Sequence, residues 1–281
     1  MPEPMKKLIL VLLPILIAIG LISCGGSNTQ KTTSNTDSSQ TTTQQPQEEN
    51  PAAEGFDAQN SDPKAIKIAD EVMKASGGRA NWDKTRLISW NFFNRRQLYW
   101  DKKTGDVRID YNNGKMNILL NVYREPLKGK VRKDSVEITQ ADSLQKYLKR
   151  GKSVWINDMY WLCMPFKLKD SGVTLKYARE DTVKGGRKAD VLTLSFKNVG
   201  DTPQNKYEVY VDQQSKLVAQ WAYFKEASQD SANFVMPWLD YQKYGNLMLS
   251  GNRGRAKLSN IQVVDDVPEK LFTSFDKVTL K

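Results

Sequence analysis

The sequence predicts an α+β domain built on a large antiparallel sheet, and three observations support this class. Apolar and polar residues alternate through much of the chain after residue 85, as in strands with one buried face. The stretch GDVRIDYNNGKMNILLNVY, residues 105–123, carries the tight-turn signal NNG between two alternating arms. Helical spacing is confined to a few segments. We therefore expect one domain with about nine to eleven strands and a few helices against one face.

The elements can be placed along the chain. The first helix is expected in SDPKAIKIADEVMKASGG, residues 61–78, with Pro63 in its first turn and a glycine pair at its end. Two shorter helices are expected, one from Thr139 and one over residues 152–164, where Pro165 ends the pattern. The alternating stretches that predict strands are residues 85–101, 105–123, 173–180, 188–196, 206–224, 246–250 and 256–264.

The net charge of +10 is unevenly distributed over the 281 residues. Residues 1–24 carry +1 and residues 25–62 carry −5, which leaves +14 for residues 63–281. A domain with this much positive charge attracts an anionic partner, such as a lipid headgroup surface or a nucleic acid. A charge that serves only to keep the protein soluble is an equally good interpretation. The chain contains no histidine, which excludes Ser-His-Asp and Cys-His mechanisms and histidine-based zinc sites.

The N-terminal stretch MPEPMKKLILVLLPILIAIGLISCGG resembles a bacterial lipoprotein signal peptide. Lys6 and Lys7 precede an apolar run, Leu8 to Ile22, that is short for a membrane span and has the length of a signal-peptide core. The run ends in LISC, which resembles a lipobox. The resemblance implies that residues 1–23 are removed and that Cys24 carries diacylglycerol and an acyl chain such as palmitate. A short anchor helix with an incidental cysteine is the alternative.

The expected domain organisation follows from the composition. Residues 24–61 contain the lipidated cysteine and a segment with almost no large apolar residue, which cannot bury enough surface to fold and forms a disordered tether. Residues 62–281 form the single β-rich domain. No acidic pair follows Gly25 and Gly26, so the sequence carries no signal for surface export and favours a position facing the periplasm. We expect the lipid anchor to lie in the outer membrane of the cell envelope.

The second cysteine, Cys163, has no partner for an intramolecular disulfide once Cys24 is lipidated. It stands between Leu162 and Met164 in a strongly apolar stretch. We interpret it as a small buried hydrophobe, because a reactive thiolate would need a base and the chain has no histidine.

Three stretches together resemble a known family. They are YWLCMPFKLKDSG (residues 160–172), DVLTLSFKNVGDTPQNKYEVYVDQQSKLVAQW (residues 190–221) and LSNIQVVDDVPEKLF (residues 258–272). The pattern resembles exported bacterial lipoproteins of undefined function, which are in turn similar to the lipoprotein carriers of the Lol system, LolA and LolB. The resemblance implies an incomplete, curved antiparallel β-barrel with helices packed on its concave face and a hollow that takes acyl chains. The lipid anchor makes the chain more similar to the membrane-bound receptor type than to the soluble carrier.

The apolar residues of this pattern are candidates for lining such a hollow. Flexible methionine and large aromatic side chains adapt to a greasy ligand of variable shape. Plain core packing is the alternative for each of them. The candidates are Trp90, Phe92, Tyr99, Trp155, Met159, Leu162, Trp221 and Tyr223. A further segment, residues 234–238, could form an exposed apolar loop or pack back over the sheet, and we favour packing.

The leading hypothesis is a non-catalytic, lipid-anchored protein that faces the periplasm and binds an acyl chain, a lipid or a lipoprotein. The alternative is a structural or sensor module that binds a partner protein, with the half-barrel filled by its own side chains. A hydrolase is a third hypothesis, resting on Asp170, Glu180 and Asp181 or on Asp265 and Asp266, which fit solvated turns better. No phosphate-binding loop is present, and we expect no metal, no cofactor and no nucleic acid. The sequence does not predict an oligomeric state.

Overall fold

The computed structural model describes residues 49–280, which all belong to one unit of the chain. The expected signal peptide, Cys24 and most of the expected tether lie outside these residues. The α-helices of the described part are α1 (Pro63–Ala75), α2 (Arg79–Lys84) and α3 (Ala141–Cys163). Two short 3-10 helices, η1 (Met164–Phe166) and η2 (Glu269–Leu271), follow α3 and β14 respectively.

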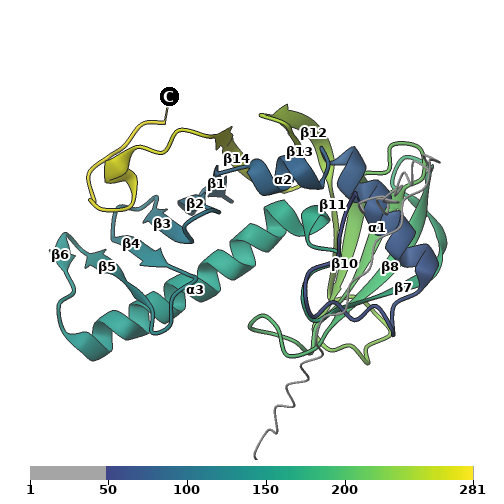
Figure 1. The fold of residues 1–281 in the computed structure, drawn as a ribbon, viewed down its shortest axis with the longest axis horizontal. Helices are drawn as coiled ribbons and strands as arrows, with labels where there is room; N and C mark the ends of the chain where they lie inside the picture. The colour runs from purple at the N-terminus through teal and green to yellow at the C-terminus, as the bar shows by residue number, and fades with distance from the viewer. Residues whose placement is uncertain (1–48, 281) are drawn as a thin grey trace, which may run out of the picture. The chain divides into compact units, whose positions relative to one another are not determined.

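The strands form two antiparallel sheets (Figure 1). The larger sheet has the order β12-β13-β14-β1-β2-β3-β4-β5-β6. Its strands are β1 (Leu87–Phe92), β2 (Arg96–Asp101), β3 (Asp106–Tyr111), β4 (Met116–Asn121), β5 (Lys128–Lys133), β6 (Val136–Glu137), β12 (Leu239–Tyr244), β13 (Leu247–Arg253) and β14 (Ala256–Val264). The smaller sheet has the order β11-β10-β9-β8-β7. Its strands are β7 (Val173–Val183), β8 (Arg187–Phe196), β9 (Lys206–Asp212), β10 (Val218–Phe224) and β11 (Phe234–Pro237).

The predicted α+β class is confirmed: the sheets are antiparallel, open and curved, and neither closes into a barrel. The fourteen strands of the described residues exceed the expected number. The additional strands, β5, β6, β11 and β12, are short or largely exposed strands at or next to the sheet edges. Such strands bury little apolar surface, so apolar and polar residues alternate only weakly along their sequences.

Helix α3 is one continuous helix of 23 residues where the sequence predicted two shorter ones. Gly151 stands between the two predicted segments, and glycine is a poor helix former. Gly151 is buried, and a Cβ atom there would lie 3.0 Å from Cγ2 of Ile118. The glycine therefore marks the place where α3 comes closest to β4 and does not mark an end of the helix.

The two faces of the larger sheet are covered differently (Figure 1). We call the face against α3 the inner face. It carries Trp90, Ile109 and Ile118, which form one core cluster with Leu148 and Leu162 of α3. The opposite face, the outer face, is covered by the chain's last described segment, residues 265–280. Leu271 and Leu280 of that segment pack with Leu87 and Tyr99.

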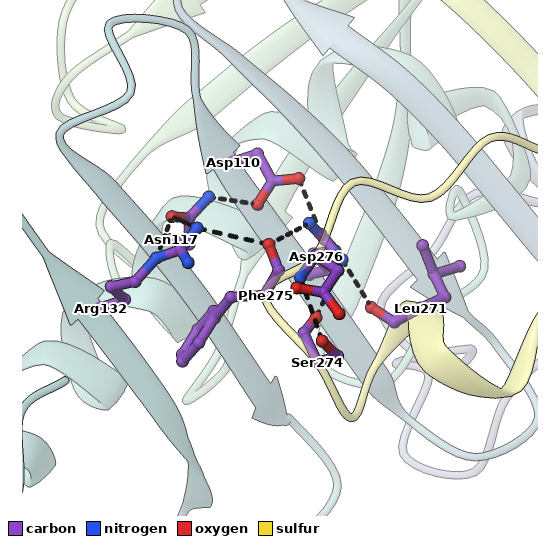
Figure 2. Close-up of polar contacts among 8 residues, drawn as sticks. Asp110, Asn117, Arg132, Leu271, Ser274, Phe275 and Asp276 are labelled. Atoms are coloured by element: carbon purple, nitrogen blue, oxygen red, sulfur yellow. Dashed lines mark hydrogen bonds and ion pairs between the residues drawn. The ribbon is translucent and has the colours of Figure 1, made fainter. Parts of the chain in front are cut away.

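Two arginines on the outer face hold the C-terminal segment (Figure 2). Arg108 of β3 is buried and donates to the carbonyl oxygens of Leu271, Ser274 and Phe275 at 3.2, 3.1 and 3.4 Å. Arg132 of β5 also donates to the carbonyl of Phe275, at 3.3 Å, and its guanidinium lies over the Phe275 ring. These contacts fix the segment across the strands without adding a strand to the sheet.

Helix α1 covers one face of the smaller sheet (Figure 1). Ala65, Ile68, Ala69 and Val72 on α1 belong to one core cluster with the sheet residues Leu175, Leu192, Leu194, Val209 and Val211. The helix was predicted over residues 61–78, and the structure confirms it within that range. Asp62 at its start accepts hydrogen bonds from the backbone N–H of Tyr177 and from Lys176, so the start of α1 is joined to β7.

Candidate functional site: an aromatic pocket with a lysine rim

A pocket of about 650 Å³ opens beside α2, the β2–β3 turn and the middle of α3. Its lining falls into three groups. The aromatic and apolar group is Trp82, Trp100, Tyr123, Trp155 and Met159. The cationic group is Lys84, Arg86, Lys102, Lys103 and Lys167, and the carboxylates are Asp83 and Asp265. The pocket therefore combines large apolar surfaces with an excess of positive charge.

Local structure explains how the aromatic wall is assembled. Trp82 lies on the six-residue helix α2, which the turn at Gly77 and Gly78 directs away from α1; both glycines have positive φ. Trp100 points to the inner face of β2, where it contacts Trp155 edge-on with ring centroids 5.3 Å apart. Met159 lies one helical turn after Trp155 and therefore on the same side of α3.

Phe166 of η1 supports the aromatic wall by stacking on Trp82. The rings of Trp82 and Phe166 are stacked at 4.4 Å with an interplanar angle of 10°. Trp82 also contacts Trp100, with ring centroids 6.3 Å apart. The ring of Trp82 is thus held between the segment after α3 and the larger sheet.

Lys102 is the cation most deeply placed in this pocket. Its Nζ donates a hydrogen bond to the carbonyl oxygen of Trp82 and lies 3.7 Å above the Trp82 ring centroid. Burial lowers the pKa of the Lys102 ammonium from its usual value of 10.5 to about 8. Within residues 49–280, no carboxylate lies within 4.0 Å of this ammonium. The positive charge of Lys102 is therefore only partly compensated.

Several other charged groups of the lining are already paired. Arg86 forms an ion pair with Asp101 at 3.2 Å, and Lys167 forms one with Asp170. The carboxylate of Asp83 is held by Arg79 at 2.9 Å. Lys84 and Lys103 are exposed on the rim, where each adds a flexible positive charge.

Cys163 lies fully buried behind this pocket, in the same core cluster as Trp155. Burial raises the pKa of the Cys163 thiol to about 12. The thiol is therefore protonated at neutral pH and acts as a small apolar side chain, as the sequence predicted.

The eight residues expected to line a hollow fall into separate regions. Trp155 and Met159 line the pocket. Trp90, Phe92 and Leu162 are buried in the inner-face core. Tyr99 lies on the outer face under the C-terminal segment, because it pairs with Ser89, whereas its neighbours Leu98 and Trp100 point inward. The remaining two candidates, Trp221 and Tyr223, lie on the smaller sheet.

Trp221 and Tyr223 belong to an aromatic group on β9 to β11 and the end of α3. Trp221 is buried between Trp161 of α3, with ring centroids 4.9 Å apart, and Tyr207 of β9, at 5.1 Å. Tyr223 stacks on Phe234 at 4.9 Å. Residues 234–238 thus pack back as β11 and the following residue, as favoured from the sequence, and Trp238 is buried while Val235 is exposed.

The carboxylates considered for a hydrolase do not converge. Asp170 is paired with Lys167 and Asp181 with Arg179, while Asp265 lies on the pocket rim. Across the described part of the chain, no group of three or more His, Cys, Asp or Glu side chains is placed to hold a metal ion. Likewise, none of the helices formed by these residues is both long and apolar enough to span a membrane.

The comparisons with known proteins concern the fold. No family model matches the chain, and the search of curated proteins found no match. Among solved structures, a DUF1329 family protein from Desulfovibrio piger is similar with a TM-score of 0.45 and 14% identity, over 75% of this chain and 98% of its own. A domain named as an outer membrane lipoprotein-sorting protein from Vibrio parahaemolyticus has a TM-score of 0.40 and 8% identity, over 74% and 96%. MucB in complex with MucA(peri) has a TM-score of 0.22 and 13% identity, over 74% and 58%.

The resemblance drawn from the sequence is confirmed at this level. A family of undefined function and a lipoprotein-sorting domain are both among the structures that the chain resembles. At these identities the likeness concerns the arrangement of sheets and helix, and the function has to be argued from the side chains of the chain itself.

Proposed function

We propose that the protein is a non-catalytic, lipid-anchored protein of the bacterial cell envelope that binds an acyl chain in the pocket beside Trp82, Trp100 and Trp155. The observation that carries this proposal is the pocket itself. Its volume of about 650 Å³ lies within the range of roughly 300–1,000 Å³ that is usual for small-molecule sites. Three tryptophans and Met159 supply the apolar lining that a hydrocarbon chain needs.

The absence of catalysis is part of the proposal. The pocket lining contains two carboxylates, and that of Asp83 forms an ion pair with Arg79. Within residues 49–280, Lys102 has no carboxylate within 4.0 Å that could act as its base. A hydrolytic site would need a nucleophile and a base within hydrogen-bond reach of each other. The lining offers surfaces and charge, which suit binding.

The position in the envelope rests on the N-terminal sequence. The apolar run that ends in LISC supports lipidation of Cys24, and a lipid anchor on a long polar tether would keep the domain near a membrane. The outer membrane, with the domain facing the periplasm, is the location we propose. A ligand with an acyl chain is available to a protein held there, either as a free lipid or as the lipid part of another lipoprotein.

A second function is favoured by one specific observation. Helix α3 fills the inner face of the larger sheet, so the centre of the half-barrel is occupied by the protein's own side chains. This supports the alternative of a module that binds a partner protein by its surface. The two functions differ in whether the pocket beside Trp155 holds a ligand.

Native mass spectrometry of the full chain, released from detergent micelles, tests the proposed function. A fixed mass increment of diacylglycerol and a fatty acid is expected on Cys24, together with a second lipid mass that dissociates on collisional activation. A diazirine derivative of a fatty alcohol is then cross-linked to the protein. Labelled peptides are expected to contain Trp82, Trp100 or Trp155.

Two tryptophan variants provide the matched comparison. Trp155→Ala is expected to abolish the labelling at the pocket, because Trp155 lines it. Trp161→Ala, on the same helix but outside the pocket lining, is expected to preserve it. Labelling spread over the protein surface, unaffected by Trp155→Ala, would contradict the acyl-binding function and favour the partner-binding module.

A further inference from the structure

We infer that the ligand of this pocket is an anionic amphiphile, whose carboxylate or phosphate head is bound by Lys102 while its chain lies on the tryptophan wall. The inference rests on the proposed function and specifies the chemical class of its ligand. It follows from the place of Lys102 in the pocket lining and from the hydrogen-bond donors that this lysine leaves unused.

Three other cations of the described residues that are largely withdrawn from water are paired with carboxylates. Arg96 is paired with the carboxylate of Asp158, Arg108 with Asp110, and Lys169 with Asp70 at 2.8 Å. These three pairs follow the rule that a cation withdrawn from water is paired. Arg253 forms no ion pair within residues 49–280: it donates to the carbonyl of Trp161 in the last turn of α3 and lies 3.5 Å over the Trp238 ring centroid, buried in the core.

Lys102 departs from this rule. Its hydrogen-bond acceptor is the neutral carbonyl of Trp82, and its nearest aromatic partner is the Trp82 ring. An ammonium has three N–H donors, so two remain after the bond to Trp82. Lys102 is part of the pocket lining, which makes its unused donors available to a bound head group.

The other charged groups of the pocket also favour an anionic head group. Of the five cations in the lining, Arg86 and Lys167 are paired with Asp101 and Asp170, which leaves Lys84, Lys102 and Lys103 beside the carboxylates of Asp83 and Asp265. Asp83, the carboxylate that opposes the lowering of the pKa of Lys102, is itself held by Arg79, and Asp265 is the other carboxylate of the lining. An entering anion replaces water around these groups with charge-assisted hydrogen bonds, which are stronger than neutral ones.

The energetic balance favours the charged form of Lys102 when an anion is bound. Burial disfavours the ammonium of Lys102 and holds its pKa at about 8. An anion within hydrogen-bond distance opposes this effect, because opposite charges stabilise each other strongly where little water is present. Ligand binding and protonation of Lys102 should therefore support each other.

The experiment compares three competitors with the same saturated C16 chain: hexadecanol, palmitate and 1-palmitoyl lysophosphatidate. Each competes with a diazirine derivative of hexadecanol for cross-linking to the full chain in micelles of a non-ionic detergent at pH 7. Palmitate or lysophosphatidate is expected to compete at concentrations at least about tenfold lower than hexadecanol, as a charge-assisted hydrogen bond predicts. A preference for one of the two anions identifies the head group as carboxylate or phosphate.

Three lysine variants assign the preference. Lys102→Met is expected to remove the advantage that the two anions have over hexadecanol in the competition. Lys102→Arg keeps the positive charge and is expected to keep the advantage of the anions over hexadecanol. Lys130→Met, on the exposed outer side of β5, serves as the matched control. Circular dichroism and unfolding curves establish that the variants are folded.

The outcomes separate the two claims. Equal competition by all three compounds, unchanged in Lys102→Met, would overturn the inference while leaving an acyl-binding pocket in place. Pocket labelling that none of the three displaces, or no pocket labelling at all, would overturn both the inference and the proposed function.

Discussion

Arg96 and Asp158 form a two-point ion pair that joins β2 to α3. Nε of Arg96 lies 2.5 Å from Oδ2 of Asp158, and Nη2 lies 2.7 Å from Oδ1. Asp158 is fully buried, and Arg96 is 14% exposed. Burial raises the pKa of Asp158 above its usual value, although the hydrogen bond from Arg96 opposes the rise. The pair therefore positions the helix that carries Trp155 at the cost of dehydrating two charges.

The first prediction concerns this pair. Asp158→Ala leaves the guanidinium of Arg96 without its partner and should lower the free energy of unfolding by about 3–5 kcal/mol. The double variant Arg96→Met, Asp158→Leu removes both charges and should lose much less than Asp158→Ala alone. Urea unfolding of the variants measures both effects. Additive losses from the two sites would show that the pair is not energetically coupled.

The second prediction concerns the two glycines where α3 crosses the sheet. A Cβ atom at Gly129 would overlap the carbonyl oxygen of Leu119 and lie 2.8 Å from Leu148. Gly129→Ala should therefore destabilise the fold by about 2 kcal/mol or more, since overpacking of a core costs roughly 1–3 kcal/mol. Gly151→Ala meets the side chains of Ile118, at 3.0 Å, and Leu120, at 3.6 Å, with no backbone atom among its nearest neighbours, and should cost less.

Ser153→Ala is the control for these glycine variants. Ser153 is exposed on the same helix, and alanine has the higher helix propensity, so this variant should be neutral or slightly stabilising. The order of stability in urea should be Ser153→Ala, Gly151→Ala, Gly129→Ala. A fully stable Gly129→Ala variant would contradict the close approach of β5 to β4 and α3.

The limits of the sequence prediction are visible in individual residues. Trp155 and Met159 could be assigned to one side of a helix, because their spacing fixes their relative direction. Tyr99 could not be assigned to a face, because the face depends on which residue of β1 it opposes. The structure pairs it with Ser89, so its ring lies on the side opposite to Trp90 and Trp100.

The lysines of the pocket, Lys84, Lys102 and Lys103, show a second limit of the sequence prediction. Trp82 and Lys102 are twenty residues apart and meet because α2 folds over the β2–β3 turn. Neither periodicity nor composition encodes that distance, which is set by tertiary packing. The only sequence signal was the net charge of the domain, and it indicated an anionic partner without locating the site.

The third prediction concerns the C-terminal segment over the outer face. Arg108→Met removes the donor to the carbonyls of Leu271, Ser274 and Phe275 and should release this segment (Figure 2). Trypsin should then cleave faster after Lys270 and Lys277. The outer-face variant Lys130→Met has no such contact and should leave the cleavage rate unchanged. Equal rates in all three proteins would show that Arg132 and the apolar contacts of Leu271 and Leu280 hold the segment without Arg108.

The fourth prediction concerns the pH dependence of stability. The pKa of Lys102 is about 8 in the folded protein, whereas its usual value is 10.5. Between these two pH values the unfolded chain binds more protons at this residue than the folded chain does. The free energy of unfolding should therefore rise with pH across this window by the contribution of Lys102, and below pH 8 the buried ammonium lowers stability.

Comparison with Lys102→Met isolates this contribution, because the variant has no ammonium at the site. At pH 7 the variant should be more stable than the natural protein, and the difference should shrink as the pH rises from about 8 to 10.5. Urea unfolding followed by tryptophan fluorescence at several pH values measures the difference. Saturation with palmitate should reduce it at pH 7, because the bound carboxylate compensates the charge that burial disfavours. A constant difference at all pH values would mean that Lys102 titrates as it does in the unfolded chain, with its ammonium well hydrated in the pocket.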